Sequence, residues 1–247
     1  MRRIDKSEHS PRNRLIEALP EDVVKRLEPY LEPVSFELGE VLYEAHDELS
    51  HVYFPTTCIV SLLSTMKNGS TAEMGVVGRD GMVGIAVFMG GETTPNQAVV
   101  QNAGDAARLT LNVFRNEYER VGALHRLLLL YTQALLTQVS QSAACNQLHS
   151  IEQRLCRSLL LSCDRLDSNE LAVTQELAAK TLGVRREAVS LVAHRLQNAG
   201  LIRYKRGHMT IMDREGLEAR VCECYRIVRT ECERLLPYQA RTVISDC

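Results

Sequence analysis

Glycine and proline are distributed unevenly along this chain of 247 residues, and their distribution limits where long helices can form. Six of the seven prolines lie at or before Pro95, and nine of the fourteen glycines lie between Gly39 and Gly104. From Asp105 to Leu182 there is one glycine and no proline. Because both residues are poor in helix interiors and mark turns, we expect short strands in the first half and long helices in the middle.

Short apolar runs fill the first half between these turns. Asn68-Gly69 is typical of a type I′ hairpin turn and would join a strand over residues 62–66 to one over 71–77. Further strands are expected at residues 98–101 and 106–111. Many short strands with glycine turns favour an antiparallel sandwich or barrel.

After Gly122 the apolar residues recur in steps of three and four, which indicates an amphipathic helix. One stripe, predicted to face a second subunit, contains Leu128, Tyr131, Leu135, Gln138, Ser142 and Cys145. An adjacent stripe contains Leu129, Thr132, Leu136, Val139 and Ala143. Two stripes can serve a domain on one side and a partner helix on the other. We therefore predict a dimerisation helix; a helix buried within one subunit is the alternative.

Residues 171–211 carry the clearest motif. Thr174 can cap a helix that ends at Gly183. A second helix is expected over residues 185–198, and Gly200 is its stop signal. Two short apolar runs then flank a basic glycine turn, which predicts a small hairpin. The order helix, turn, helix and hairpin is that of a winged helix-turn-helix.

The formal net charge of −2 conceals a local basic excess. From Lys180 to Arg214, eight Lys and Arg stand against two acidic residues, a net of +6, so the remainder of the chain carries −8. Arg185 and Arg186 begin the second helix, where each positive charge opposes the helix macrodipole by about 0.3–1 kcal/mol. DNA phosphates or guanine edges would give these arginines a partner, so a DNA-binding surface is predicted.

These motifs resemble those of the Crp/Fnr family of bacterial transcription regulators. The resemblance covers roughly Leu15 to Leu217 and is strongest in TQELA at 174–178, LGVRREAVS at 182–190 and LQNAGLI at 196–202. It implies an α+β fold with an N-terminal antiparallel, jelly-roll-like β-roll of the cyclic-nucleotide-binding type, a long central dimerisation helix and a C-terminal winged helix-turn-helix. The implied units are a flexible segment 1–14, a β-roll effector domain 15–121, a dimerisation helix 122–149, a DNA-binding domain 150–237 and a tail 238–247.

The resemblance also implies roles for single residues in DNA binding. Arg186 and Glu187 match the family's base-reading Arg-Glu pair, and Ser190 matches a position that reads bases in the Fnr branch. Leu191 stands where the family often has a second arginine, so a different half-site is expected. The predicted DNA contacts are Thr174, Gln175, Arg185, Arg186, Glu187, Ser190, His194, Arg203, Lys205 and Arg206.

The effector site is expected to differ from that of cyclic-AMP-binding relatives. Gly84-Ile85 stands in place of the Gly-Glu pair that holds the ribose, and Asn96-Gln97 stands in place of the Arg-Ser pair that holds the phosphate. Because an unpaired phosphate in a half-buried pocket is costly, no useful affinity for cyclic AMP is expected, and the effector is unknown. Arg79 and Arg108 could bind an anion or be solvated surface residues.

The eight cysteines contain no C-x-x-C pair, so a zinc site of the common spacing is not expected. No cofactor and no metal are predicted. The first cysteine is Cys58, so the N-terminal cysteine group that binds the iron–sulfur cluster of Fnr-type members is missing. Cys222 and Cys224 are expected to point in different directions on a helix.

Cys145, His149 and Cys156, together with Glu152, share one stripe if the predicted helix continues through them. A redox-, metal- or small-ligand-sensing regulator that uses this stripe or the β-roll pocket is the alternative function. Simple packing of buried cysteines in a core is the other interpretation.

The predicted function is a sequence-specific DNA-binding transcriptional regulator that acts as a homodimer on a palindromic site. Expected partners are double-stranded DNA, a second copy of the chain and RNA polymerase. The longest apolar run, residues 127–131, is far shorter than the roughly 18 residues of a membrane span, and the N-terminus lacks a signal peptide, so a cytoplasmic protein is expected. No Walker loop, H-E-x-x-H motif or Ser/His/Asp order is present, so an enzyme is not expected.

Overall fold

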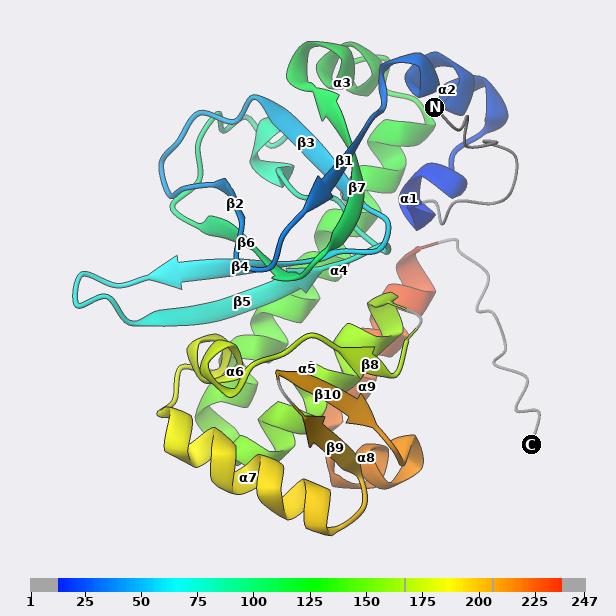
Figure 1. The fold of residues 1–247 in the computed structure, drawn as a ribbon. Coiled ribbons are helices and arrows are strands. Elements are labelled where there is room, and N and C mark those ends of the chain that lie inside the picture. The colour runs from blue at the N-terminus through cyan, green and yellow to red at the C-terminus, as the bar shows by residue number, and fades with distance from the viewer. Residues whose placement is uncertain (1–12, 167, 206, 237–247) are drawn as a thin grey trace, which may run out of the picture.

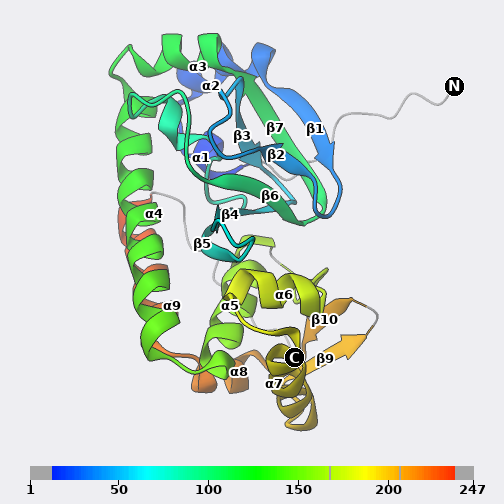
Figure 2. The ribbon, with the colours of Figure 1, turned by 90° about the vertical axis from the view of Figure 1, so that its left-hand side faces the viewer.

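The computed structural model describes residues 13–166, 168–205 and 207–236. A β-rich unit and a smaller helical unit are connected by one long helix, α4, which runs beside the β-rich unit and reaches the helical one (Figures 1 and 2). None of the described helices combines the length and apolar character that a bilayer crossing needs. The predicted segments 1–14 and 238–247 lie almost wholly outside the described residues.

The secondary structure follows the predicted order of strands first and helices later. The N-terminal unit consists of α1 (Arg14–Glu17), α2 (Glu21–Leu27), the 3-10 turn η1 (Glu28–Tyr30), β1 (Glu32–Phe36), β2 (Val41–Tyr43), β3 (His51–Pro55), β4 (Ile59–Thr65), β5 (Thr71–Val77), the 3-10 turn η2 (Ile85–Val87), β6 (Gln97–Asn102), β7 (Gly104–Thr110) and α3 (Leu111–Tyr118). It is followed by α4 (Ala123–Leu148), α5 (Ile151–Leu166), β8 (Glu170–Leu171), α6 (Gln175–Leu182), α7 (Arg186–Asn198), β9 (Ile202–Lys205), β10 (His208–Ile211), α8 (Arg214–Arg220) and α9 (Glu223–Leu235).

Two antiparallel sheets form the β-roll, with strand orders β1-β7-β3 and β2-β6-β4-β5. Apolar side chains from both sheets, among them Val60, Val100 and Ala106, pack into one buried cluster. Strand β6 shows the period of a strand most clearly, because Ala98 and Val100 are buried in this cluster while Val99 between them is only half-buried. The predicted antiparallel β-roll is confirmed.

The β4–β5 hairpin is present at Asn68-Gly69, but its turn differs from the predicted type I′. Met66 N–H donates to the Ser70 carbonyl at 2.8 Å, which leaves a three-residue loop. Gly69 has φ +80°, whereas Asn68 keeps a negative φ and its Oδ1 accepts from Ser70 N–H at 3.0 Å. A three-residue loop needs only one residue in the left-handed region, and glycine supplies it.

Helix α4 is positioned by side chains that enter the β-roll. Tyr131 donates its hydroxyl to the Met82 carbonyl at 2.9 Å, and Gln138 Nε2 donates to the Val76 carbonyl at 3.0 Å. All six side chains of the predicted dimer stripe are buried within one chain: Leu128, Tyr131, Leu135, Gln138, Ser142 and Cys145. This corrects the predicted dimer face. The β-roll covers the stripe at Tyr131 and Gln138, whereas Ser142 accepts from Arg157 of α5 and Cys145 lies against Cys222.

The adjacent stripe of α4 is partly exposed, although Thr132 is buried and Val139 is half-buried. Leu129 is 52% exposed and Leu136 is 58% exposed, although both are large apolar residues. They are seven residues apart, so they lie on the same face two turns from each other.

The C-terminal unit is the predicted winged helix-turn-helix. Helices α5, α6 and α7 and the three-stranded antiparallel sheet β8-β10-β9 enclose a core that contains Leu160, Val189, Leu196 and Met209. The short strand β8 pairs with β10 and adds a third strand to the predicted hairpin.

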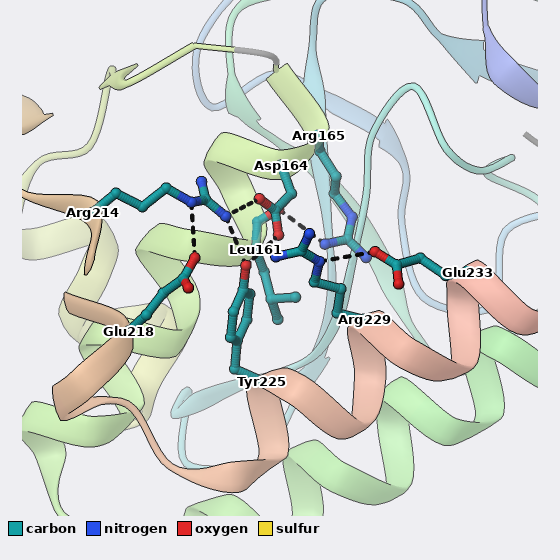
Figure 3. A network of polar contacts seen from close by, with 8 residues as sticks. All are labelled: Leu161, Asp164, Arg165, Arg214, Glu218, Tyr225, Arg229 and Glu233. Atoms are coloured by element: carbon teal, nitrogen blue, oxygen red, sulfur yellow. Dashed lines mark hydrogen bonds and ion pairs between the residues drawn. The ribbon is translucent and has the colours of Figure 1, made fainter. Parts of the chain in front are cut away.

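Helix α9 leaves the C-terminal unit and packs along α4 (Figure 2). Its end, Leu235 and Leu236, is buried in the same core as Phe54 and Leu128 of the N-terminal unit. A polar network fixes its start (Figure 3): Arg214 of α8 donates to Asp164 at 2.5 Å, and the Tyr225 hydroxyl donates to the same carboxylate at 2.9 Å.

Candidate nucleic-acid interface

The helix-turn-helix is held by the cap and turn residues that the sequence indicates. The Thr174 hydroxyl accepts from Leu177 N–H at 3.0 Å and caps α6. Gly183 has φ +62° at the end of α6, a conformation that a residue with a Cβ adopts only with strain. Arg185 precedes α7 in an extended conformation without a side-chain cap, so the first N–H groups of α7 lack that partner.

Helix α7 separates an apolar face from a polar one. Val189, Val192, Ala193 and Leu196 are buried against α5 and α6 and fix the rotation of the helix about its axis. The predicted DNA contacts at the start of the helix, Arg185, Arg186 and Glu187, are exposed, as are Leu191 and His194. The burial pattern therefore leaves the start of α7 available to a partner.

The wing is attached directly to α7. Gln197 Oε1 accepts from the Tyr204 N–H of β9 at 2.8 Å, so the hairpin is fixed relative to the helix. Arg203 and Lys205 are exposed on β9, and Gly207 at the turn has φ +84°. Arg206, also a predicted contact, lies outside the described residues. Figure 1 shows α7 and the β9–β10 hairpin at the same end of the molecule, away from the β-roll.

The basic residues of this region fall into two groups. Lys180 pairs with Glu176, Arg195 with Glu152, and Arg214 belongs to the Asp164 network. By contrast, no ion pair joins Arg185, Arg186, Arg203 or Lys205 to any acidic group in the described part of the chain. The unpaired positive charge is therefore concentrated at the start of α7 and on the wing.

Three predicted contacts make hydrogen bonds within the motif. Ser190 donates its hydroxyl to the side-chain oxygen of Gln175, which joins α7 to the start of α6. His194 Nδ1 lies 3.1 Å from the Asn198 amide nitrogen. Ser190 and Gln175 therefore have a structural role before any DNA is bound.

The β-roll residues aligned with a cyclic-nucleotide site have other contacts. Gly84 has φ +101° and precedes η2, and the Gln97 amide donates to Glu44 Oε2 at 2.6 Å. Arg108 pairs with Glu32 across the β1–β7 ladder at 2.9 Å. Arg108, one of the two arginines that could bind an anion, is therefore already paired with Glu32 at the surface.

The predicted cysteine stripe is divided between two helices. Helix α4 ends at Leu148, His149 has extended backbone angles, and α5 begins at Ile151. Cys156 is buried in the winged-helix core, and burial raises the pKa of its thiol to about 12, which makes it a poor nucleophile. Cys145 instead lies 3.5 Å, sulfur to sulfur, from Cys222, a contact that the sequence analysis did not predict.

Sequence reasoning also missed three buried arginines of α5. Arg157 donates to the Ser142 hydroxyl of α4 at 2.5 Å, and Arg154 donates to the Leu182 carbonyl at the end of α6. Arg165 donates to Gln138 Oε1 at 2.6 Å. These arginines connect α5 to α4 and α6, and nothing in the sequence distinguishes them from exposed arginines.

Two family models match separate parts of the chain. The Crp-like helix-turn-helix domain matches residues 153–220, and the cyclic nucleotide-binding domain matches residues 33–121, which together make up more than half of the chain. This chain belongs to the Crp/Fnr family. It is a Crp/Fnr transcription regulator with a helix-turn-helix DNA-binding domain; family members bind DNA and typically act as dimers, and they are not enzymes.

Solved Crp/Fnr structures share this fold. FixK2 from Bradyrhizobium japonicum has 14% identity and a TM-score of 0.63, and covers 78% of this chain and 98% of its own. A CRP-family transcriptional regulator from Thermus thermophilus has 21% identity and a TM-score of 0.63, with coverage of 76% and 95%. The c-di-GMP responsive global regulator CLP of Xanthomonas campestris has 15% identity and a TM-score of 0.61, with coverage of 78% and 99%. Identities this low show the fold alone, and no curated protein sequence matches the chain significantly.

Proposed function

We propose that this Crp/Fnr regulator binds a palindromic DNA site as a homodimer, with the start of each α7 in a major groove. The observation that carries the proposal is the unpaired charge of Arg185 and Arg186 at the start of α7, next to that of Arg203 and Lys205 on the wing. A positive charge at the start of a helix opposes the helix macrodipole and therefore lowers the stability of the helix. Contact with a DNA phosphate offsets that loss of stability.

The contacts divide into base readers and phosphate holders. Arg186 can donate two hydrogen bonds to a guanine, and Glu187 can accept from a cytosine amino group. Arg185, Arg203 and Lys205, together with Thr174 and Arg206, hold phosphates and set the register. Ser190 and Gln175 already bond to each other, so they stiffen the motif and can contact a base only by exchanging that bond.

A selection of bound fragments from genomic DNA, followed by footprinting, tests the proposal. The expected result is a two-fold symmetric site whose half-sites are about 34 Å apart, one turn of DNA. An asymmetric site, or equal recovery of unrelated fragments, would contradict it. RNA polymerase is the proposed second macromolecular partner, and its retention on the selected fragments in the presence of the regulator is the matching measurement.

We assign the dimer contact to the exposed stripe of α4. The stripe that the sequence predicted to face a second subunit is buried within the chain. Leu129 and Leu136 supply the apolar seam, and Gln133, Ser140 and Ala143 are exposed at intermediate positions with short or polar side chains. This spacing is typical of a two-helix contact.

Leu136→Glu is expected to convert the dimer to a monomer in analytical ultracentrifugation, because two carboxylates would be buried in one seam. Met66→Glu is the matched control, since Met66 is also an exposed apolar residue but lies at the tip of the β4–β5 hairpin. A dimer that survives Leu136→Glu would contradict the assignment.

Cyclic AMP is not the proposed effector. Ile85 offers no carboxylate to a ribose, the Gln97 amide is bonded to Glu44, and Arg108 is paired with Glu32. CLP responds to c-di-GMP, so effectors differ among proteins of this fold. Calorimetric titration with cyclic AMP is expected to give no heat of binding, and a dissociation constant in the micromolar range would contradict this.

A further inference from the structure

Three cysteines and one histidine converge where α4 ends and α9 begins. Cys145 and His149 come from the end of α4, while Cys222 and Cys224 come from the start of α9. The three sulfurs and one histidine nitrogen all lie within 4.8 Å of one another, and all three cysteines are buried. Among the described residues this is the group with the composition of a metal site.

Two of the six separations between the ligand atoms match the edges of a tetrahedral zinc site, and the other four are at most 4.8 Å. Cys145 Sγ lies 3.5 Å from Cys222 Sγ, and Cys224 Sγ lies 3.6 Å from His149 Nδ1. A tetrahedral zinc ion with bonds of about 2.3 Å to sulfur and 2.0 Å to nitrogen places its ligand atoms about 3.5–3.8 Å apart. One ion at the centre therefore needs only small shifts of the side chains.

The surroundings of the cluster also match those of a metal site. Glu223 Oε2 lies 3.4 Å from His149 Nε2, so a carboxylate faces the ring nitrogen opposite the one that points to sulfur. Such a carboxylate orients a metal-binding imidazole and fixes its tautomer.

A guanidinium lies near the cluster, because Arg157 donates to Ser142, which precedes Cys145 by one turn of α4. A divalent cation stabilises the thiolates directly. Arg157 supplies further positive charge close to a centre that carries a net charge of −1 with three thiolates.

A disulfide and an iron–sulfur cluster both fit this geometry less well than a single ion. A disulfide requires a sulfur separation of about 2.05 Å, whereas 3.5 Å separates Cys145 from Cys222, and it would leave the positions of His149 and Cys224 without a reason. A polynuclear iron–sulfur cluster needs ligands spread around several metal ions, whereas these four ligand atoms all lie within 4.8 Å of one another.

We propose that Cys145, His149, Cys222 and Cys224 bind one Zn²⁺ ion in a closed tetrahedral site. Binding exchanges three thiol protons, released to solvent, for three zinc–sulfur bonds, and His149 Nδ1 donates its lone pair as the fourth ligand. Four protein ligands leave no open position, so the site is structural. It joins the end of the long helix to the start of α9, next to the break between α4 and α5.

The test uses the full chain, expressed with added zinc and purified under reducing conditions. Mass-spectrometric metal analysis is expected to find about one zinc per chain in the wild type and to find the zinc largely lost in Cys222→Ser and Cys224→Ser. Cys156→Ser is the matched control, because Cys156 is an equally buried cysteine on α5 outside the cluster, and it is expected to retain its zinc.

A second measurement needs no variant. Metal-free wild-type protein titrated with Co²⁺ is expected to develop the strong visible and sulfur-to-metal charge-transfer absorption of a tetrahedral thiolate site, with an end point at about one equivalent. Added Zn²⁺ is expected to remove that absorption.

The outcomes are decisive in both directions. Wild-type protein without stoichiometric zinc that also gives only the weak spectrum of octahedral Co²⁺ would overturn the proposal. Equal loss of zinc from Cys156→Ser and Cys222→Ser would overturn it too. So would a Cys145–Cys222 disulfide that persists in protein purified under reducing conditions. If the serine variants fail to fold, the cobalt titration of the wild type decides alone.

Discussion

The arginines at the start of α7 and the arginines of α5 occupy opposite environments. Arg154, Arg157 and Arg165 are at most 9% exposed and donate to groups on α4, α5 or α6. Arg185 and Arg186 are exposed and pair with no acidic group among the described residues. The same side chain therefore has two roles. The arginines of α5 hold the two units together, and the arginines at the start of α7 remain available to DNA.

The difference teaches that a count of charges cannot separate these roles, whereas position on a helix can. Residues three or four apart lie on one helix face, and the buried face of α5 carries its arginines into the junction with the β-roll. At the start of α7 the buried face begins only with Val189, so the arginines before it remain in solvent.

The largest effect on stability is expected from substitution of a buried arginine of α5. Arg165 pairs with Asp80 at 3.2 Å and with Gln138. Arg165→Met removes the charge at similar length, leaves Asp80 without this partner, and is expected to lower the free energy of unfolding by about 3 kcal/mol in urea titrations. Arg203→Met, on the wing, is the control and is expected to change it by less than about 0.5 kcal/mol. Equal losses of stability in Arg165→Met and Arg203→Met would contradict the distinction between buried, structural arginines and exposed ones.

The second prediction tests the exposed side. Arg186→Ala is expected to reduce the discrimination between operator and random DNA by about 1–3 kcal/mol, because a bidentate contact to guanine is lost. Stability should be unchanged or slightly higher, since a charge that opposes the helix dipole is removed. Electrophoretic or anisotropy titrations on both DNAs measure this. Arg234→Ala, an exposed arginine paired with Glu231 on α9, is the control; discrimination lost to the same extent there would count against the assignment.

Local sequence was sufficient to predict the winged helix. Its caps, turns and apolar positions lie within residues 174–211, so each signal acts on its neighbours: Thr174 caps α6 and Gly183 ends it. Glycine turns between short strands predicted an antiparallel sandwich or barrel for a similar reason, and the resemblance to the Crp/Fnr family specified a β-roll. The type of the Asn68-Gly69 turn was wrong, since the closing Met66–Ser70 bond sets the loop length.

Contacts between distant segments could not be predicted in the same way. Both stripes of α4 are apolar, and only the position of the β-roll determines that Leu135 is buried while Leu136 is exposed. The cysteine cluster depends on the return of α9 along α4, which brings Cys222 to Cys145 across 77 residues. The spacing of Cys145 and His149 by one helical turn was the available signal, but it needed a second pair from elsewhere.

The third prediction concerns a carboxyl group near the buried arginines. Burial raises the pKa of Glu73 to about 7 from its ordinary 4.5, although a hydrogen bond from Ser61 and the charges of Arg157 and Arg165 act in the opposite direction. The folded protein therefore binds more protons than the unfolded chain between these values. The free energy of unfolding is expected to fall as pH rises from about 4.5 to about 7, by at most about 1.4 kcal/mol per pH unit.

Glu73→Gln is expected to remove this contribution, so the variant gains stability relative to the wild type as the pH approaches 7. Unfolding titrations at several pH values measure the difference in slope. Glu119→Gln, at an exposed position after α3, is the control and should follow the wild type. Parallel curves for Glu73→Gln and the wild type would contradict the raised pKa.

The smallest effect is expected from the wing, where charge acts without reading sequence. Lys205 is exposed and contacts phosphate in the proposed complex, so Lys205→Ala is expected to weaken operator and random DNA by the same factor. The slope of the logarithm of affinity against the logarithm of salt concentration should decrease by about 1, because one fewer counterion is released. Lys25→Ala is the matched control, because Lys25 is an exposed lysine paired with Glu21 on α2. A loss confined to the operator would assign Lys205 to base reading, and an unchanged slope would remove the wing from the interface. Only the second result would restrict the unpaired charge that serves DNA to the start of α7.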